Sequence, residues 1–481
     1  MKKLFKILAA GAMILAVSSC CKNKEQSEQY PMFWTWIEDI PAVDASNPTL
    51  DMEVAFTHME EAGLDAVMLH AVSAEDYKKD IEIARRHGIK VYAWVWTLNP
   101  PRQERAQMLE EHPDWFSVNR LGESVSQTKA YVNSYKFLCP ALPEVREYLK
   151  NKVEEICAID GIEGICLDYC RLIDCVLPIS LAYNYNLRQD TEVFPEYDYG
   201  YHPAMIEKFK AQYGYDPRES EDPSRDEKWC QFRCDQVTEV ANIMCDVAHK
   251  AGKKTTASPF AAAGLCKFMV YQDWGKWDLD MVHPMAYVDF YTMDPSFAYD
   301  ATLDNYLAKA EGTTLMCGVD TELGGDPEFI FDKMDEAFKA GAQGISLYTI
   351  EGLNTEDLRA RFKVYADSLR QVRAEGKLPA APGVAASVDP LANAGLKALV
   401  ERNIQRLVAG EQIHVRSVNG MVPDDPAKTY PALDLSEYQL VKNNDRLLVY
   451  EVSDKASGQK FNVLFVIYGK VVSGWDIRPT T

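Results

Sequence analysis

The sequence is short of positive charge and of histidine. Among its 481 residues, 51 are Lys or Arg and 72 are Asp or Glu, which gives a formal net charge of −21 at pH 7. An acidic protein repels phosphate backbones, so we expect no nucleic acid partner, whereas a neutral ligand such as a sugar is not excluded. Only 8 residues are His. None stands at ligand spacing beside the closely spaced cysteines, so we expect no metal and no other cofactor.

Long apolar runs are also missing, except at the N-terminus. Lys2, Lys3 and Lys6 precede the apolar run 7–17, and no other segment is apolar enough to span a membrane. The run itself is too short to cross a bilayer and is typical of the central region of a signal peptide. Export of the chain follows from this interpretation.

The end of that run carries a second signal. Val17-Ser18-Ser19-Cys20 places small residues before a cysteine, which resembles the bacterial lipoprotein signal, in which the cysteine becomes the lipidated first residue. We therefore predict a signal peptide over 1–19, lipidation at Cys20 and a tether over 20–30, with an ordinary signal peptide as the alternative. The predicted location is the cell envelope, lipid-anchored at the periplasmic face or the outer-membrane surface.

The twelve cysteines do not form an obvious disulfide framework. Several fall inside predicted strands or on apolar helix faces, as Cys166, Cys317, Cys157 and Cys245 do, and buried cysteine often acts as a small apolar residue. For Cys170, Cys175, Cys230 and Cys234, a disulfide, a metal site and plain packing all remain open.

The clearest pattern is a repeated unit: an amphipathic run, then Gly, then a short apolar run. Gly after a helix is a common left-handed cap, and such apolar runs are typical of buried strands. Five units begin at Gly63, Gly88, Gly161, Gly252 and Gly341, and three further apolar runs, 32–37, 281–285 and 314–319, lack the Gly. Strands joined by helices pair in parallel. Eight of them over about 340 residues predict an α/β fold, a (β/α)8 barrel spanning residues 31–372.

The residues after the predicted barrel differ in composition. Segment 373–388 is rich in Ala, Gly and Pro, which is typical of a linker. Residues 389–481 hold one amphipathic run and then β-rich runs with hairpin signals at Asn443-Asn444 and Ser457-Gly458. They predict a small α+β domain with an antiparallel sheet. Because a linker predicts few contacts across it, we expect the barrel to fold alone; a sheet that docks on the barrel and shapes a binding groove is the alternative.

Acidic residues follow several predicted barrel strands. Asp168 comes directly after an apolar strand, which places it at the barrel mouth, where such barrels hold their catalytic groups. A buried carboxylate costs several kcal/mol unless it is paired, and Arg171 is a candidate partner. Other strand-end acids are Glu38, Asp39, Asp289, Asp320, Glu322 and Glu351. Converging carboxylates suit glycoside hydrolysis, which needs one acid and one base or nucleophile.

Polar and aromatic residues lie at the same strand ends. His70, Trp94, Trp96, Asn99 and His283 belong to this group. A histidine there is either a ligand-binding group or a packed core residue, and the two tryptophans share one face of their strand. The long segment 169–201 is rich in Tyr and Phe, which either stack on sugars or pack the segment onto the barrel.

These motifs resemble the bacterial glycosyl-hydrolase-like family 10 proteins, which are distantly related to the α-amylase superfamily. The resemblance rests on the run from Asp160 to Arg171, on Gln272-Asp273-Trp274, on the run from Pro284 to Tyr287 and on the run from Gly344 to Tyr348. It implies a (β/α)8 barrel in which Asp168 is the catalytic carboxyl residue at the end of strand four. The α-amylase superfamily usually carries a Glu at the end of strand five, whereas here that strand ends in Ala257-Ser-Pro-Phe260.

The leading hypothesis is a glycoside hydrolase that cleaves O-glycosidic bonds of a poly- or oligosaccharide at the cell envelope. Asp168 is the expected nucleophile or base, and the proton donor is expected among Glu351, Glu322 and Asp289. The residues expected to bind substrate are Tyr169, Arg171, His70, Trp96, Asn99, His283 and Tyr287. Two alternatives remain: a catalytically inactive carbohydrate-binding lipoprotein, and a metal-dependent deacetylase that uses Asp168 with His70 or His283.

Overall fold

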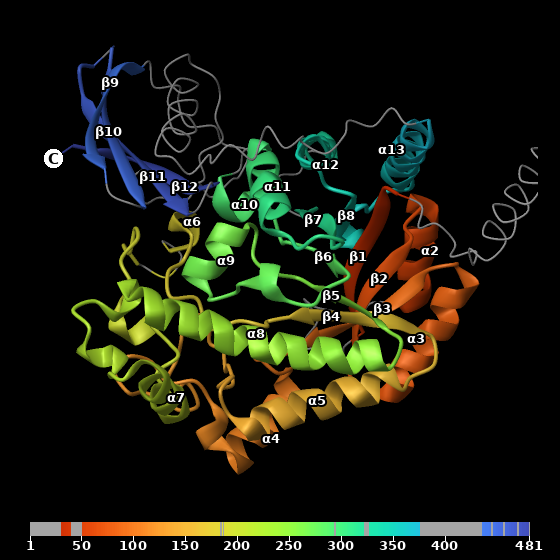
Figure 1. Cartoon of the computed structure of the whole chain (residues 1–481). Helices are drawn as coiled ribbons and strands as arrows, with labels where there is room; N and C mark the ends of the chain where they lie inside the picture. The colour runs from red at the N-terminus through yellow and green to blue at the C-terminus, as the bar shows by residue number, and fades with distance from the viewer. Residues whose placement is uncertain are drawn as a thin grey trace, which may run out of the picture.

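Eight parallel strands close into a barrel in chain order (Figure 1). The computed structural model describes residues 30–39, 51–182, 185, 187–292, 295–321, 327–375, 435–443, 446–455, 457–468 and 471–480. The barrel strands are β1 (Met32–Asp39), β2 (Ala66–Ala71), β3 (Lys90–Trp96), β4 (Ile162–Asp168), β5 (Lys254–Ala257), β6 (Met281–Val282), β7 (Thr314–Asp320) and β8 (Gly344–Tyr348). The predicted (β/α)8 barrel is confirmed.

The five predicted glycines all take positive φ, between 70° and 105°, at Gly63, Gly88, Gly161, Gly252 and Gly341. In this region a side chain is strained, so Gly ends each preceding helix and lets the chain enter the next strand. At Gly161 a Cβ atom would also lie 2.5 Å from Ile81 Cγ2. The repeated unit read in the sequence is therefore a real structural unit.

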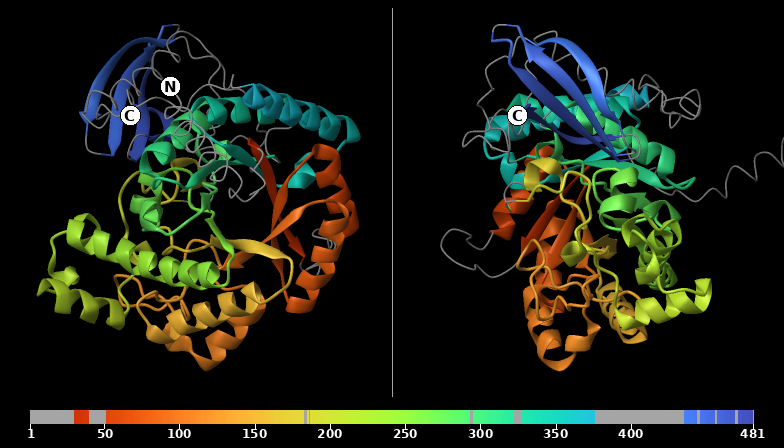
Figure 2. Two further views of the ribbon diagram at one scale, coloured as in Figure 1. Left: turned by 45° about the vertical axis from the view of Figure 1, so that its right-hand side comes forward. Right: turned by 90° about the vertical axis from the view of Figure 1, so that its left-hand side faces the viewer.

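Helices surround the barrel and fill the connections between its strands. The α-helices before β5 are α2 (Met52–Ala62), α3 (Ala74–Arg86), α4 (Arg102–Glu111), α5 (Pro143–Cys157), α6 (Ile179–Ala182), α7 (Pro203–Tyr213) and α8 (Glu227–Lys250). Those after β5 are α9 (Ala263–Met269), α10 (Val288–Tyr291), α11 (Ser296–Ala308), α12 (Pro327–Lys339) and α13 (Glu356–Ala374). Figure 2 shows α5 and α8 lying along the outside of the barrel. No described helix is long and apolar enough to cross a membrane.

Short 3-10 turns complete the connections: η1 (Pro113–Trp115), η3 (Pro195–Tyr197), η4 (Pro217–Glu219), η5 (Pro223–Arg225), η6 (Trp274–Lys276) and η7 (Ile350–Gly352). The insertion after β4 is the longest irregular part of the barrel mouth. Some of its aromatic rings pack it onto the barrel, since Tyr199 and Tyr201 are buried. Tyr185 is 41% exposed, so the packing interpretation holds for one part of the segment and leaves another part open to a ligand.

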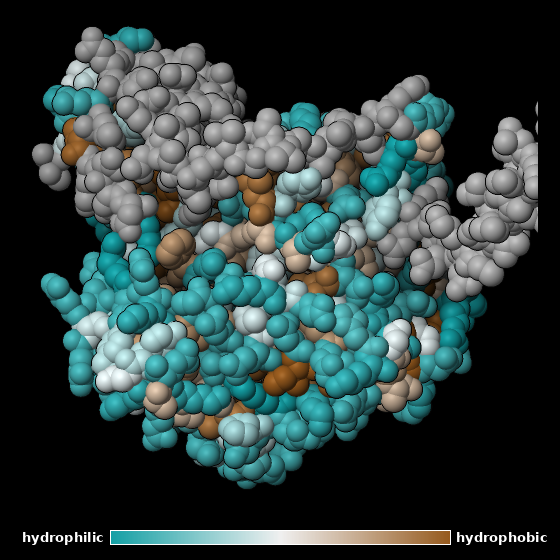
Figure 3. All heavy atoms as spheres, in the orientation of Figure 1, coloured by the Kyte–Doolittle hydropathy of each residue, from teal (hydrophilic) through white to brown (hydrophobic). Residues whose placement is uncertain are grey.

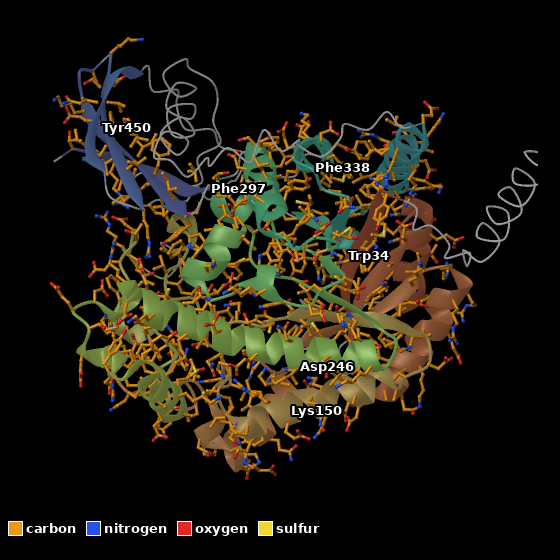
Figure 4. The ribbon with its side chains drawn as sticks, in the orientation of Figure 1. Trp34, Lys150, Asp246, Phe297, Phe338 and Tyr450 are labelled. Carbon is orange, nitrogen blue, oxygen red and sulfur yellow. The ribbon has the colours of Figure 1, made fainter. Side chains whose placement is uncertain are left out.

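The barrel interior is filled by large side chains. Successive residues of a strand point to opposite faces, and one face of each strand contributes to an inner cluster of Met32, Trp34, Trp36, Ala66, Met68, Tyr92, Trp94, Cys166, Met281 and Met316. Trp96 packs against this cluster. Trp94 and Trp96 therefore face the interior, a choice that the strand period alone leaves open; Figure 4 labels Trp34 of the same cluster.

The C-terminal part forms an antiparallel sheet in the order β12-β11-β10-β9. Its strands are β9 (Leu435–Asn443), β10 (Leu447–Asp454), β11 (Lys460–Tyr468) and β12 (Val471–Pro479). The predicted linker beyond Glu375 and the predicted helix lie outside the described residues.

This sheet packs against the barrel beside α6, α9 and α11 (Figures 1 and 2). Leu464, Val466 and Val471 belong to the same apolar cluster as Ile173 and Ile179 of the barrel insertion. The expectation of few contacts across the linker is wrong, because the sheet and the insertion after β4 bury apolar side chains against each other. Docking of the sheet on the barrel, which the sequence analysis allowed for, is observed.

Candidate active site

A cavity of about 320 Å³ opens at the carboxyl ends of the barrel strands. We call it the central cavity, and its lining includes Glu38 from β1, Trp94 and Trp96 from β3, Asp168 from β4 and Tyr348 from β8. The insertion after β4 and the segments after β3, β5 and β6 supply the remaining wall. Its position is the one at which barrels of this kind hold their chemistry.

Asp168 is the last residue of β4 and lies in the wall of the central cavity, with 5% of its surface exposed. Its Oδ2 accepts a hydrogen bond from Trp94 Nε1 at 2.9 Å, and its Oδ1 accepts one from the Tyr169 backbone N–H at 2.5 Å. Burial raises the pKa of this carboxyl to about 6, although these two donors and the charge of Arg171 act in the opposite direction. Among the described residues no basic side chain forms an ion pair with Asp168.

Tyr169 turns the chain away from the end of β4. It has a φ of 50°, which is uncommon for a residue with a side chain. This backbone conformation accompanies the hydrogen bond from its N–H to the Asp168 carboxylate. Tyr169 thus holds one oxygen of Asp168 while its ring lines the central cavity.

Glu38, near the end of β1, is the second carboxyl of the central cavity. Burial raises its pKa to about 7, and the negative charges of Asp168 and Glu351 add to this shift. Near neutral pH the cavity therefore contains one carboxylate, Asp168, and one carboxyl that keeps its proton for much of the time, Glu38. A cavity that holds two carboxyls with raised pKa values can offer one as a proton donor and the other as a carboxylate.

Arg171 forms its ion pair with Asp174 rather than with Asp168, so the sequence interpretation of its partner is corrected. Arg171 Nη1 lies 2.8 Å from Asp174 Oδ2, and both side chains are buried. The guanidinium also lies over four rings, with its carbon 4.7 Å from the Phe260 centroid and at similar distances from Tyr135, Phe137 and Tyr169. The Arg171–Asp174 pair lines the central cavity and is largely neutral as a unit.

Aromatic rings form most of the remaining wall. Tyr287 stacks on Tyr348 with centroids 4.9 Å apart, and Trp36 meets both rings edge to face. Trp96 and Tyr169 meet at 5.3 Å. Flat apolar faces beside carboxyl groups suit a sugar ring, which presents C–H faces and hydroxyl edges.

The other predicted acids lie outside the lining of the central cavity. Asp289 is buried in α10, and Glu351 is exposed in η7, where it accepts a hydrogen bond from Thr349 Oγ1. Glu351 still acts on the site through its charge, which raises the pKa of Glu38. Glu322 lies outside the described residues. Neither described candidate donor therefore shares the cavity with Asp168.

Asp320, at the end of β7, is tied to the protein on both oxygens. Its Oδ1 accepts a hydrogen bond from the Val288 N–H at 2.9 Å, and its Oδ2 lies 2.9 Å from Lys333 Nζ. Both side chains of this ion pair are buried. The contacts explain Asp320 as a structural residue that joins β7, α10 and α12.

The polar residues predicted from β2, β3 and β6 do not line the central cavity. His283 is fully buried, its Nδ1 lies 2.8 Å from Ser346 Oγ, and burial lowers its pKa to about 3. Asn99 Oδ1 accepts from the Lys136 N–H at 3.0 Å. Both are therefore packed, hydrogen-bonded structural residues.

His70 lines a neighbouring depression of about 350 Å³, which also includes Glu104, Tyr148 and Lys152. Its Nδ1 lies 3.1 Å from the Trp94 carbonyl oxygen, its ring stacks on Trp96, and burial lowers its pKa to about 4. His70 therefore supports the tryptophan wall from behind rather than facing Asp168.

The donor set does not fit a catalytic metal. Neither His70 nor His283 lines the cavity of Asp168, and among the described residues no group of three or more His, Cys, Asp or Glu side chains is arranged to hold a metal ion. All ten cysteines of the described residues are free, including Cys170, Cys175, Cys230 and Cys234. The disulfide and metal alternatives for those four are thus not realised, and packing accounts for them.

A larger groove of about 710 Å³ lies on the outside of the barrel between α5 and α8. Its charged side chains form ion pairs along the helices, such as Lys150 with Glu154 and Lys250 with Asp246. Figure 4 labels Lys150 and Asp246 on the two facing helices, and Figure 3 shows this face of the molecule as mostly hydrophilic. We interpret the groove as a solvated seam between helices, because it lies away from the strand ends.

Glu38 is the residue that the sequence analysis recognised as a strand-end acid without assigning it to the site. The strand Met32–Asp39 continues two residues beyond its apolar part, so its acids looked like any of the other strand-end acids. A usable signal was present: Trp34, Trp36 and Glu38 share one face of that strand. Since the first two fill the barrel interior, the third extends from the same face to the mouth.

The family model described as glycosyl hydrolase-like 10 matches residues 74–311. No curated protein matches the chain.

Solved structures similar to this chain include the catalytic domain of the β-amylase of Paenibacillus polymyxa, with 12% identity, a TM-score of 0.49 and coverage of 72% of this chain and 99% of that one. The GH36 α-galactosidase of Geobacillus stearothermophilus has 8% identity and a TM-score of 0.40 over 92% of this chain and 48% of that one. The GH20 modules of a pneumococcal exo-β-D-N-acetylglucosaminidase have 10% identity and a TM-score of 0.38 over 78% and 91%. The strand pairing described above establishes the barrel independently of these similarities.

Proposed function

We propose that this protein is a glycoside hydrolase whose two catalytic carboxyls are Asp168 and Glu38, and the match of residues 74–311 to the glycosyl hydrolase-like 10 model supports the proposal. The observation that carries the proposal is that Asp168 and Glu38 line one cavity at the carboxyl ends of the barrel strands, and burial raises the pKa of both carboxyls, to about 6 and about 7. Such a pair supplies the base or nucleophile and the acid that glycoside hydrolysis needs.

Each carboxyl has a distinct role. Glu38 in its protonated form donates a proton to the glycosidic oxygen as the bond to the leaving sugar breaks. Asp168 in its charged form stabilises the positive charge that develops at the anomeric carbon, and it attacks that carbon or removes a proton from the attacking water. Trp94 and Tyr169 hold the carboxylate of Asp168 in one orientation through their hydrogen bonds, so little reorganisation is needed during the reaction.

The side chains that line the central cavity indicate the class of substrate. Tyr287, Tyr348 and Trp96 offer aromatic faces for a sugar ring, and Asp174 and Tyr135 offer polar groups for hydroxyls. The cavity carries acids and one Arg that is already paired, so it favours a neutral poly- or oligosaccharide over an anionic one. No cofactor takes part in this chemistry.

The test is a hydrolysis assay of the purified protein on a panel of neutral aryl glycosides and oligosaccharides, with Asp168→Asn as the matched inactive control. We expect the dependence of kcat/KM on pH to be bell-shaped. Activity rises as Asp168 loses its proton near pH 6 and falls as Glu38 loses its proton near pH 7. Saturable binding of an oligosaccharide with no hydrolysis of any substrate would instead favour the catalytically inactive carbohydrate-binding protein.

We also propose that the protein is anchored in the cell envelope through lipid on Cys20. The proposal rests on the lipoprotein-like sequence Val17-Ser18-Ser19-Cys20, and both Cys20 and the tether lie outside the described residues. Two or more acyl chains hold a protein stably on a membrane, whereas one does so only weakly. Cys20→Ala should therefore move the protein from the membrane fraction to the soluble fraction, and a variant that stays with the membrane would contradict the proposal.

A further inference from the structure

The C-terminal sheet touches the segment that forms one wall of the central cavity. Leu177, Pro178 and Leu181, from within and just before α6, line the cavity. The same short helix contacts β12. At Gly474 of β12, a Cβ atom would lie 2.5 Å from Ile179 Cγ2, so the strand approaches α6 as closely as a glycine permits.

Polar and aromatic contacts join the sheet to both sides of α6. Arg478 of β12 forms an ion pair with Asp190 at 2.9 Å, on the chain that follows the helix. Before α6, the contact is indirect. Tyr468 of β11 contacts the ring of Phe268 in α9, and the backbone oxygen of Phe268 accepts a hydrogen bond from Cys175 Sγ at 3.1 Å. Cys175 lies just before the wall segment, so the sheet holds this segment near both of its ends.

The wall segment has little structure of its own. Helix α6 contains four residues, and a single helical turn is unstable without tertiary contacts because the cost of fixing its backbone is not met by its few hydrogen bonds. Its inner side faces the cavity and its outer side faces β12. The docked sheet therefore supports this wall from its outer side, in addition to the contacts of α6 with α10.

The wall is apolar where it meets the cavity. Leu177, Pro178 and Leu181 carry no acid or base, and Tyr185 stands at the rim with its ring edge to face with Tyr131. The carboxyls Asp168 and Glu38 come from β4 and β1 and make no contact with the sheet among the interactions given for the described residues. The wall thus contributes contact area for substrate and not the reacting groups.

We propose that the C-terminal sheet is a positioning element of the substrate site, in which β12 holds α6 against the central cavity so that docking of the sheet and binding of substrate stabilise each other. The kinetic half of this inference rests on the proposed glycosidase function, and the structural half does not. Thermodynamic linkage requires the coupling to be reciprocal. A ligand bound in the cavity stabilises the docked sheet, and a variant that loosens the sheet lowers the affinity of the cavity for the ligand by the same factor.

The first experiment uses Gly474→Val in the full-length protein. Valine suits a strand, but its side chain must displace Ile179. Hydrogen exchange followed by mass spectrometry should show peptides covering residues 176–182 exchanging at least about tenfold faster than in the wild type. On a hydrolysed oligosaccharide, KM should rise about five- to tenfold with kcat within about twofold, because only contacts that bind substrate are lost. Val441→Ser, on a 51% exposed side chain of β9, is the matched control and should leave both measurements unchanged.

The second experiment uses milder variants, so that a folding failure of Gly474→Val leaves the inference testable. Asp190→Asn removes one partner of the ion pair that follows α6, and Asn tolerates the φ of 50° at position 190. Arg478→Ala removes the other partner and also the contact of Arg478 with the buried Asp476 of β12, so its effect includes a loss within the sheet. Each should raise KM about two- to threefold, and the double variant should show less than the product of the two effects, because they remove the same interaction.

The outcomes are distinct. Unchanged exchange over 176–182 in every variant would overturn the positioning role of the sheet, and faster exchange with unchanged KM would overturn the substrate role of the wall. If the wild type hydrolyses no glycoside, the proposed function has failed, and the exchange result alone then decides whether the sheet positions α6.

Discussion

The ends of β4 and β7 each carry a buried aspartate, but their surroundings are opposite. Asp320 on β7 is paired with Lys333 and with a backbone N–H, so its charge is compensated within the protein. Asp168 on β4 receives two hydrogen bonds and no ion pair among the described contacts, and burial raises its pKa to about 6. An uncompensated buried carboxylate costs stability, and we therefore propose that Asp168 is kept for chemistry, whereas Asp320 is kept for the fold.

The same distinction applies to the acids nearby. Glu38 shares the cavity of Asp168 and has a pKa raised to about 7, whereas Arg171 and Asp174 neutralise each other in the same wall. We therefore propose that the β1 and β4 ends form a reactive half of the barrel mouth and that the β7 end forms a structural half. Four predictions, from the largest effect to the smallest, test this division.

Asp168→Asn should abolish hydrolysis while preserving the fold. The amide keeps the shape of the side chain and removes only the charge that acts on the anomeric carbon, so kcat should fall by about 10⁴-fold or more. The measurement is the steady-state rate on the best substrate of the panel, with circular dichroism as the check on folding. Retention of most of the activity would remove Asp168 from the reactive half.

Glu38→Gln should lower kcat/KM by about 10²- to 10⁴-fold on substrates with a poor leaving group, because proton donation is lost. Aryl glycosides with an acidic phenol need little protonation and should recover most of the rate. The matched control is Glu351→Gln, which removes a nearby exposed acid that acts on Glu38 only through its charge. An equal loss in the two variants would argue against Glu38 as the specific donor.

Asp320→Asn should reduce stability and not the chemistry. Removing one partner of a buried ion pair leaves Lys333 uncompensated, which costs about 3–5 kcal/mol in the free energy of unfolding. Chemical denaturation measures this loss, and Asp168→Asn is the comparison. That variant should keep or gain stability above pH 6, since the raised pKa of Asp168 means that stability falls as the pH rises from the ordinary value of 3.8 to about 6, and the loss is complete above that pH.

Trp94→Phe should raise the pKa of Asp168 further, because Trp94 Nε1 stabilises the charged form. A hydrogen bond to a charged group contributes about 1.5–3 kcal/mol, so the acidic limb of the kcat/KM profile should move up by about one pH unit or more. Because the charge of Asp168 contributes to the raised pKa of Glu38, the two limbs are coupled, and the profile should become narrower with a lower maximum. Trp36→Phe is the matched control, because its Nε1 donates to Ser258 while its ring lines the same cavity. A shift of equal size in both variants would argue against the Trp94 hydrogen bond as its cause.

Much of the fold could be predicted because it depends on local sequence patterns, in which a Gly follows an amphipathic run and precedes an apolar run. Each Gly that ends a helix has the positive φ that its position implies, and each apolar run that follows is a strand. The docking of the C-terminal sheet could not be predicted in this way. It depends on contacts such as Gly474 with Ile179, between residues nearly 300 positions apart, as the numbering shows.

For the site, the sequence determined that Asp168 stands at the barrel mouth, because the carboxyl ends of all the parallel strands lie there and Asp168 directly follows the apolar part of its strand. It also determined that other acids stand at neighbouring strand ends. Only the tertiary structure decided their roles. Burial, cations and hydrogen-bond donors come from different elements: Lys333 on α12 compensates Asp320, Asp174 takes Arg171 away from Asp168, and the interior face of β1 brings Glu38 into the cavity. The physical reason is that the pKa of an acid depends on distances across the barrel, and these distances exist only once all eight strands have closed.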